Sequence, residues 1–143
     1  MKVIVDADAC PRAVLKIIKR LRSEYAYRLI TVASFNHNIT GPEHIVVGDE
    51  CQAADMAIIN RTVEDDIVVT ADWGLASLAL GKSAKAISPS GVIYTNKKID
   101  LMLEERHLKE KIRQSGGRTK GPSARKEKED EKFLESFKKL LHN

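Results

Sequence analysis

The sequence predicts a three-layer α/β/α protein with a mainly parallel central sheet and additional C-terminal helices. Short apolar runs rich in β-branched residues alternate with longer helical segments, the pattern of repeated βαβ units. The chain has 143 residues, of which 43% are hydrophobic, so it has the size and core material of one compact domain. Its longest apolar runs, such as 3–5 and 67–69, are far shorter than the ~20 residues of a membrane span.

The first strand and the first helix are expected at the N-terminus. Residues 1–5 form an apolar run that ends at Asp6, which is typical of a strand buried on both faces. Cys10 is the expected helix cap, and Pro11 takes the first helical position, where no backbone hydrogen bond is lost. Apolar residues then recur at helical spacing as far as Leu21, with basic residues on the opposite face.

Four further strands and two connecting helices follow. The strands are expected at 29–33, 45–47, 67–70 and 84–87. A helix from about Cys51 to Val63 leads to the fourth strand, and another helical stretch runs through Leu80. Parallel strands need crossover connections of this kind, and the helices then cover both faces of the sheet.

Two helices and a loop are expected in the last third of the chain. Asn96 is the expected cap of a long helix that Gly116-Gly117 stops, and Ser123 is the expected cap of a final amphipathic helix. The apolar stripe of the long helix consists of Ile99, Met102, Leu103, Leu108 and Ile112. The predicted organisation is an α/β domain at 1–113, a basic glycine-rich loop at 114–122, and a C-terminal helix at 123–143 packed on the same domain.

Positive charge is concentrated near the end of the chain, although the net charge is only +4. Residues 1–104 hold 12 Lys or Arg against 13 Asp or Glu, whereas 105–143 hold 12 against 7. Within 106–126, eight basic residues accompany a single acid, Glu110. This density of positive charge favours a nucleic acid as partner.

Acidic residues follow the predicted strands, close to where each strand ends. They are Asp6, Asp8, Asp49, Asp55 and Asp72. Because the carboxyl ends of parallel strands share one edge of the sheet, these side chains should converge there. Two carboxylates ~4 Å apart repel by about 4 kcal/mol at an effective dielectric of 20, so a cluster needs raised pKa values or a cation. The two cysteines are too few for a cysteine-only zinc site, and an all-oxygen pocket suits Mg²⁺ or Mn²⁺.

Helix capping is the competing interpretation of three of these acids. Asp8, Asp49 and Asp72 each precede a predicted helix, where a carboxylate satisfies unpaired backbone N–H groups. Asp6 is harder to explain in this way because it closes an apolar strand. If the acids are only caps, the protein is a non-catalytic nucleic-acid-binding protein.

A haloacid-dehalogenase-type phosphatase with Asp6 as nucleophile is a second alternative. Such enzymes also open with a strand and Asp-x-Asp, and Gly48-Asp49 with Asp55 imitates their later acidic motif. The chain departs from that pattern in two ways. Cys10 stands where a Thr or Val is expected, and no lysine occurs between Lys19 and Lys82 to neutralise a phosphorylated aspartate.

Five segments together resemble the bacterial YaiI/YqxD family, which is itself similar to the PIN-like nucleases. The segments are Val5 to Pro11, Ala54-Asp55, Thr70 to Ala76, Ser88 to Gly91 and Ser115 to Pro122. The resemblance implies a PIN-like α/β domain in which clustered acids hold Mg²⁺ or Mn²⁺ and activate water against an RNA phosphodiester. It assigns catalytic and metal-binding roles to Asp6, Asp8, Asp55 and Asp72, with Asp49 as a further metal ligand.

Two positions depart from this family pattern. Gln52 stands where many relatives are expected to have an acid, and Ser90 stands where an arginine often follows the proline. Gln52 favours a single well-bound metal ion.

Basic residues around the glycine-rich loop are the expected nucleic-acid contacts. They are Arg113, Arg118, Lys120, Arg125 and Lys126. Glycines let the backbone approach a phosphate while the basic side chains neutralise it. The N-terminus lacks an apolar segment followed by a cleavage site, so a cytoplasmic protein without a membrane partner is expected.

Overall fold

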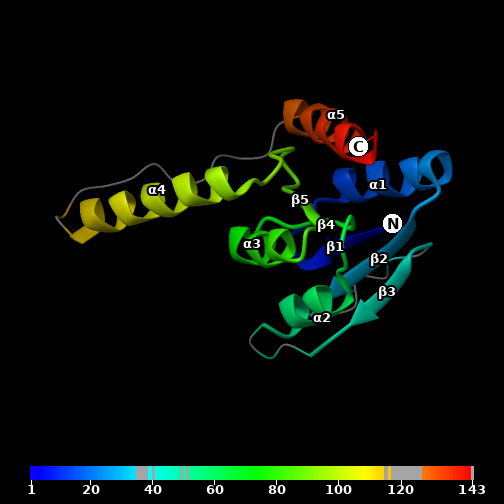
Figure 1. Ribbon diagram of the computed structural model, residues 1–143, viewed down its shortest axis with the longest axis horizontal. Helices are drawn as coiled ribbons and strands as arrows, with labels where there is room; N and C mark the ends of the chain where they lie inside the picture. The colour runs from blue at the N-terminus through cyan, green and yellow to red at the C-terminus, as the bar shows by residue number, and fades with distance from the viewer. Residues whose placement is uncertain are drawn as a thin grey trace.

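A five-stranded, all-parallel sheet with the order β3-β2-β1-β4-β5 forms the centre of the protein (Figure 1). The computed structural model describes residues 1–34, 39, 41–48, 50, 52–114, 116 and 127–142. The strands are β1 (Lys2–Asp6), β2 (Arg28–Ala33), β3 (Glu43–Val46), β4 (Ile67–Val69) and β5 (Lys85–Ile87). The α/β fold class predicted from the sequence is confirmed.

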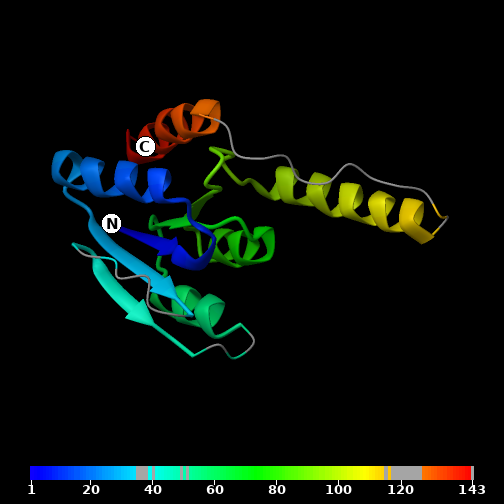
Figure 2. The same ribbon diagram turned by 180° about the vertical axis from the view of Figure 1, so that it is seen from behind.

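Helices cover both faces of the sheet (Figures 1 and 2). The helices are η1 (Ala7–Ala9), α1 (Arg12–Tyr25), α2 (Ala53–Arg61), α3 (Trp73–Gly81), α4 (Asn96–Gln114) and α5 (Glu127–His142). Two separate core clusters result. Val3 and Val5 belong to the cluster with α1 and α5, and Ile4 belongs to the cluster with α2, α3 and the start of α4. This alternation along β1 produces the three layers, because successive side chains of a strand point to opposite faces.

The C-terminal helix α5 is part of the core. Phe133 and Phe137 are fully buried, and their rings stack with centroids 5.2 Å apart. Tyr25 of α1 hydrogen-bonds His142 at 3.0 Å, and the Lys85 ammonium donates to the Leu140 carbonyl at 3.2 Å. The C-terminal end of α5 is therefore tied to both α1 and β5.

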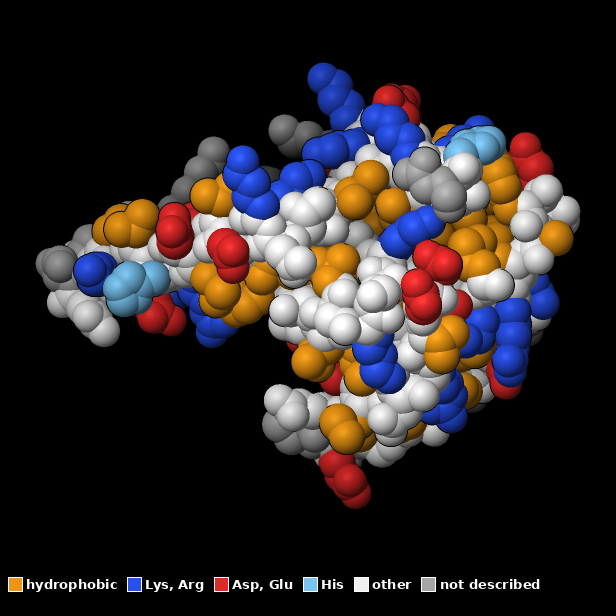
Figure 3. Space-filling view, in the orientation of Figure 1, with side chains coloured by type: hydrophobic (Ala, Val, Ile, Leu, Met, Phe, Trp, Pro, Cys, Tyr) orange, Lys and Arg blue, Asp and Glu red, His pale blue; other side chains and the backbone are white. Residues whose placement is uncertain are grey.

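The long helix α4 differs most from the expected packing. Of its predicted apolar stripe, Ile99 is buried and Met102 partly buried, whereas Leu103, Leu108 and Ile112 are exposed. Beyond its first turns α4 extends away from the sheet as an arm with apolar side chains on its surface (Figure 3). These apolar residues are spaced as on one face of a helix, but no other described helix or strand covers the exposed part of that face.

Two helices begin later than the sequence pattern predicted. Pro11 is the N-cap of α1, with extended ψ of 147°, and the helix begins at Arg12. Helix α2 begins at Ala53 after Gln52 in the left-handed conformation, with φ of 64°, and it ends at Arg61. Cys51 and the expected cap Ser123 lie outside the described residues.

A buried ion pair fastens the start of β1 to the turn before β4. The Lys2 ammonium lies 2.8 Å from the Asp66 carboxylate, which also accepts hydrogen bonds from the backbone N–H groups of Lys2 and Val63, each at 2.9 Å. Burial alone would raise the pKa of Asp66, but these hydrogen bonds outweigh it and hold the pKa below its ordinary value.

We expect Asp66→Asn to lower the free energy of unfolding at pH 7 by about 1–3 kcal/mol, because the Lys2 ammonium loses its counter-charge. A carboxyl with a lowered folded-state pKa stabilises the protein above its unfolded pKa of about 3.9 and loses that contribution as the pH falls further. Urea unfolding of both proteins at pH 7 and at pH 3 checks this. The difference between them should shrink at pH 3, and a difference that stays constant would contradict the ion-pair assignment.

Candidate functional site

A crevice lined in part by Asp55 and Asp72 lies near the carboxyl ends of β1 and β4. From β1 the chain builds outward to β2 and β3 on one side, and then returns to add β4 and β5 on the other. Parallel α/β proteins bind ligands at such a reversal of strand order. Val5 pairs with Val69, so Asp6 and Thr70, the next residues, lie side by side at the ends of β1 and β4.

Hydrogen bonds link the residues at the carboxyl ends of β1 and β4. The Thr70 hydroxyl donates to Asp6 Oδ2 at 3.0 Å and accepts from the Asp72 N–H at 3.0 Å. Tyr94, buried under the same strand end, donates its hydroxyl to the Thr70 carbonyl at 3.1 Å. Thr70 is fully buried, so it fixes the positions of both acids relative to the sheet.

The pKa values of two acids at this edge of the sheet are raised. Burial, together with the charges of Asp55, Asp8 and Asp72, raises the pKa of Asp6 to about 6, although the Thr70 hydrogen bond acts in the opposite direction. Burial and the charge of Asp72 also raise the pKa of Asp55. Burial is the larger cause of both shifts, and the charges of the other predicted site acids add to it.

Two of the acids also have structural roles. Asp72 is the N-cap of α3, and its Oδ1 accepts hydrogen bonds from the N–H groups of Gly74 at 2.8 Å and Leu75 at 3.4 Å. Asp8 does not cap α1. It lies exposed in η1 and accepts a hydrogen bond from the Ser34 N–H at 2.8 Å, which joins it to the end of β2. Capping therefore explains Asp72 in part and leaves Asp6 and Asp55 unexplained.

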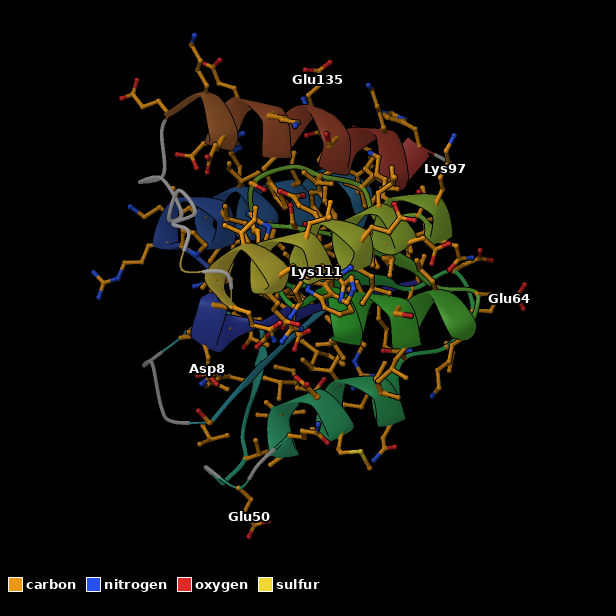
Figure 4. The ribbon with its side chains drawn as sticks, turned by 90° about the vertical axis from the view of Figure 1, so that its left-hand side faces the viewer. Asp8, Glu50, Glu64, Lys97, Lys111 and Glu135 are labelled. Carbon is orange, nitrogen blue, oxygen red and sulfur yellow. The ribbon has the colours of Figure 1, made fainter. Side chains whose placement is uncertain are left out.

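Asp49, the fifth predicted ligand, lies outside the described residues. Its neighbour Glu50 points outward, away from Asp8 and the sheet (Figure 4).

The donor chemistry of the edge suits a hard cation, but the side chains are not gathered around one point. Asp6, Asp55 and Asp72 form no ion pair with any described Lys, Arg or His. In the described residues, no three His, Cys, Asp or Glu side chains lie close enough together to enclose a metal ion. Mg²⁺ commonly uses only one or two carboxylates and keeps its remaining waters, so the residues present fit that mode of binding.

The crevice is a cavity of about 460 Å³ that lies between α2, α3 and α4. Its lining includes Gln52, Asp55, Met56, Asp72, Trp73, Leu78 and Arg106. A neighbouring groove of about 330 Å³ shares Trp73 and Arg106 and continues along α4 past Lys109 to Arg113. Acidic and basic residues thus line two hollows that share Trp73 and Arg106.

The basic residues predicted to contact nucleic acid are only partly described. Arg113 lies exposed at the end of α4, in the groove next to the acidic cavity. The other four, Arg118, Lys120, Arg125 and Lys126, lie outside the described residues.

Three residues of this region were not predicted as site residues. Thr70 directly follows the clearest strand of the sequence, and a hydroxyl at that position is itself a signal for a site at a strand end. Tyr94 and Arg106 offered no such signal, because their approach to the crevice depends on how α4 leaves the sheet.

These features define a class: a parallel α/β protein with a carboxylate-lined crevice at the reversal of its strand order. A profile described as "Uncharacterized BCR, YaiI/YqxD family" matches residues 4–143. The chain is 45% identical to a UPF0178 protein of Heliobacterium modesticaldum over 99% of this chain and 97% of that protein. It is 43% identical to a UPF0178 protein of Exiguobacterium sibiricum, over 99% and 96% of the two chains.

The chain belongs to the YaiI/YqxD family, as its motifs led us to expect. No solved structure matches it significantly. None of the helices in the described ranges has the length and apolar character needed to cross a bilayer.

Proposed function

We propose that this protein is a Mg²⁺- or Mn²⁺-dependent nuclease that hydrolyses RNA phosphodiesters, as the similarity of its family to PIN-like nucleases implies. The observation that supports this most is the arrangement at the ends of β1 and β4, where Thr70 hydrogen-bonds both Asp6 and the Asp72 N–H, and where burial and three other carboxylates raise the pKa of Asp6 to about 6. Carboxylates that form no ion pair with a described basic side chain are stabilised by a bound cation. One or two of the carboxylates of Asp6, Asp55 and Asp72 would hold the ion directly, and water would fill its remaining positions.

The bound ion would supply an activated water and charge stabilisation for in-line attack on the phosphodiester. The residues of the chain have separate tasks. Asp6 would orient the ion, and the Thr70 hydroxyl, which donates to its Oδ2 at 3.0 Å, keeps its carboxyl in place. Arg106 lies where it can attract the phosphate, which the acids alone would repel.

Cleavage of a single-stranded RNA oligomer with Mn²⁺ or with a chelator tests this proposal. We expect cleavage only with Mn²⁺, and we expect Asp55→Asn to remove it. Glu64→Gln is the matched control, because Glu64 is exposed in the turn before β4, at the opposite edge of the sheet (Figure 4). Hydrolysis of a small phosphate monoester in place of RNA would instead support the phosphatase with Asp6 as nucleophile.

Thermal unfolding provides a measurement that does not depend on activity. Mn²⁺ at a hundred times its Kd should stabilise the protein by about 2.7 kcal/mol, and Asp55→Asn should reduce this gain while Glu64→Gln keeps it. RNA binding without metal dependence, cleavage or Mn²⁺ stabilisation would establish the non-catalytic alternative.

A further inference from the structure

The side chain of Arg106 lies over the ring of Trp73. Trp73 begins α3 directly after Asp72 and is half-buried in the wall of the 460 Å³ cavity. The Arg106 guanidinium carbon lies 5.6 Å from the ring centroid, in cation–π geometry. The other recorded partner of Arg106 is Glu110, at 3.7 Å, in a pair that is more than half exposed on both sides. Exposed pairs contribute little to stability, so Arg106 is easily displaced from the ring.

Apolar side chains border the rest of this cavity. Met56 of α2 is 59% exposed and Leu78 of α3 is 57% exposed, although both line the hollow next to Trp73. Large apolar groups next to an aromatic ring provide a surface for a flat, partly apolar ligand. A nucleobase has that shape, and every base has a π-face that an indole can stack on.

The charged residues around the cavity indicate which class of molecule would carry this flat group. Asp55 and Asp72 lie in the cavity beside Trp73, and the groove along α4 is lined by Arg106, Lys109 and Arg113 together with Glu105 and Glu110. The basic residues of this groove outnumber its acids, and its two ion pairs are exposed and contribute little, so the groove favours phosphates over a cationic peptide. A single polynucleotide strand has a base for the cavity and phosphates for the basic groove, whereas in a duplex the bases are stacked and paired.

We infer that the cavity between α2, α3 and α4 binds one nucleobase of a single-stranded polynucleotide, stacked on Trp73 in place of or beneath the Arg106 guanidinium. The phosphates that follow this base lie along Arg106, Lys109 and Arg113. The inference rests on the proposed function for the polymer, but base binding requires neither a metal ion nor cleavage.

The single tryptophan of the chain makes this testable by fluorescence. A uridine oligomer titrated into the protein in the presence of chelator should quench Trp73, and an abasic oligomer of the same length should not. Equal quenching by both oligomers would overturn the inference, as would binding of the uridine oligomer without quenching. Quenching by a lysine-rich peptide alone would identify a cation site and overturn it too.

Substitutions of Trp73 and of Arg106 test separately how stacking and charge contribute to binding. Binding is measured by the fluorescence anisotropy of a labelled oligomer. We expect Trp73→Phe to bind within a few-fold of the original protein and Trp73→Leu to bind about 10-fold or more weakly, the usual loss of a stacked base. Arg106→Gln should lower the salt slope of binding by ~0.7, whereas Lys128→Gln, on the exposed face of α5, should leave it unchanged.

Far-ultraviolet circular dichroism checks that each variant is folded, and equal affinities of the folded Phe and Leu variants would contradict the stacking role. Failure of the nuclease proposal is distinguishable from failure of this inference. Base-dependent quenching in chelator without Mn²⁺-dependent cleavage supports the base site and rejects the nuclease.

Discussion

Asp6→Asn is expected to stabilise the protein at pH 7 while abolishing Mn²⁺-dependent RNA cleavage. Loss of a partner that merely orients a metal ligand costs 10–100-fold, so loss of the carboxylate itself should exceed ~100-fold in rate. The opposite effect on stability has a separate cause. Burial and three neighbouring carboxylates make the ionised form of Asp6 unfavourable, and Asn removes the charge while it can still accept the Thr70 hydrogen bond.

The gain in stability from Asp6→Asn should increase as the pH rises. The folded-state pKa of Asp6, about 6, lies above the unfolded value, so ionisation destabilises the fold. This penalty is absent below about pH 4, grows as the pH rises and is complete above about pH 6. The shift corresponds to about 3 kcal/mol, and solvent screening at this half-buried carboxyl reduces the expected gain to about 1–2 kcal/mol.

Urea unfolding of the original protein and Asp6→Asn at pH 4 and pH 7.5, without metal, measures this effect. The variant should be the more stable protein at pH 7.5 only. Mn²⁺ should then stabilise the original protein more than the variant. Equal stability of the two proteins at both pH values would remove the electrostatic basis for the site.

Gly91→Ala is expected to lower the free energy of unfolding by about 2–4 kcal/mol, because two penalties coincide. Gly91 has φ of +90°, which side-chain-bearing residues rarely adopt. A Cβ at this position would also lie 2.7 Å from the Lys132 carbonyl carbon and 2.7 Å from the Phe133 nitrogen. Both atoms belong to the backbone of α5, which cannot move aside as the end of a side chain can.

Gly81→Ala is the matched control. Gly81 ends α3 with no atom within 4 Å of an added Cβ and without a positive φ, so alanine there should change stability by less than about 1 kcal/mol. The two variants should therefore differ clearly in thermal unfolding. Equal melting temperatures would show that α5 does not pack against the turn at Gly91.

The sheet could be predicted from sequence because its strands are short and completely buried. The β-branched runs at Val3–Val5 and Ile67–Val69 have no polar face, which excludes an exposed helix or edge strand. Helix α4 could not be placed in the same way. Its apolar residues have helical period, but periodicity identifies a stripe and says nothing of whether another layer covers it.

The positions of those site residues that lie at or near strand ends could be predicted from the sequence. Asp6 is the last residue of β1, and Asp72 lies shortly after the end of β4, so the parallel topology alone brings them to one edge. Their exact neighbours depend on tertiary packing. The approach of Arg106 to Trp73 follows from the direction in which α4 leaves the body, and no local pattern in the sequence specifies that direction.

The burial of α5 has a consequence for synthesis on the ribosome. Phe133 and Phe137 share one core cluster with Val3 and Val5, which are translated long before them. While α5 is still in the exit tunnel, α1 is the only helix of this core cluster available to cover that face of the sheet, and part of its apolar surface stays exposed. Such a surface is a substrate for chaperones that act near the tunnel exit, and the packing of this face is completed only after α5 has left the tunnel.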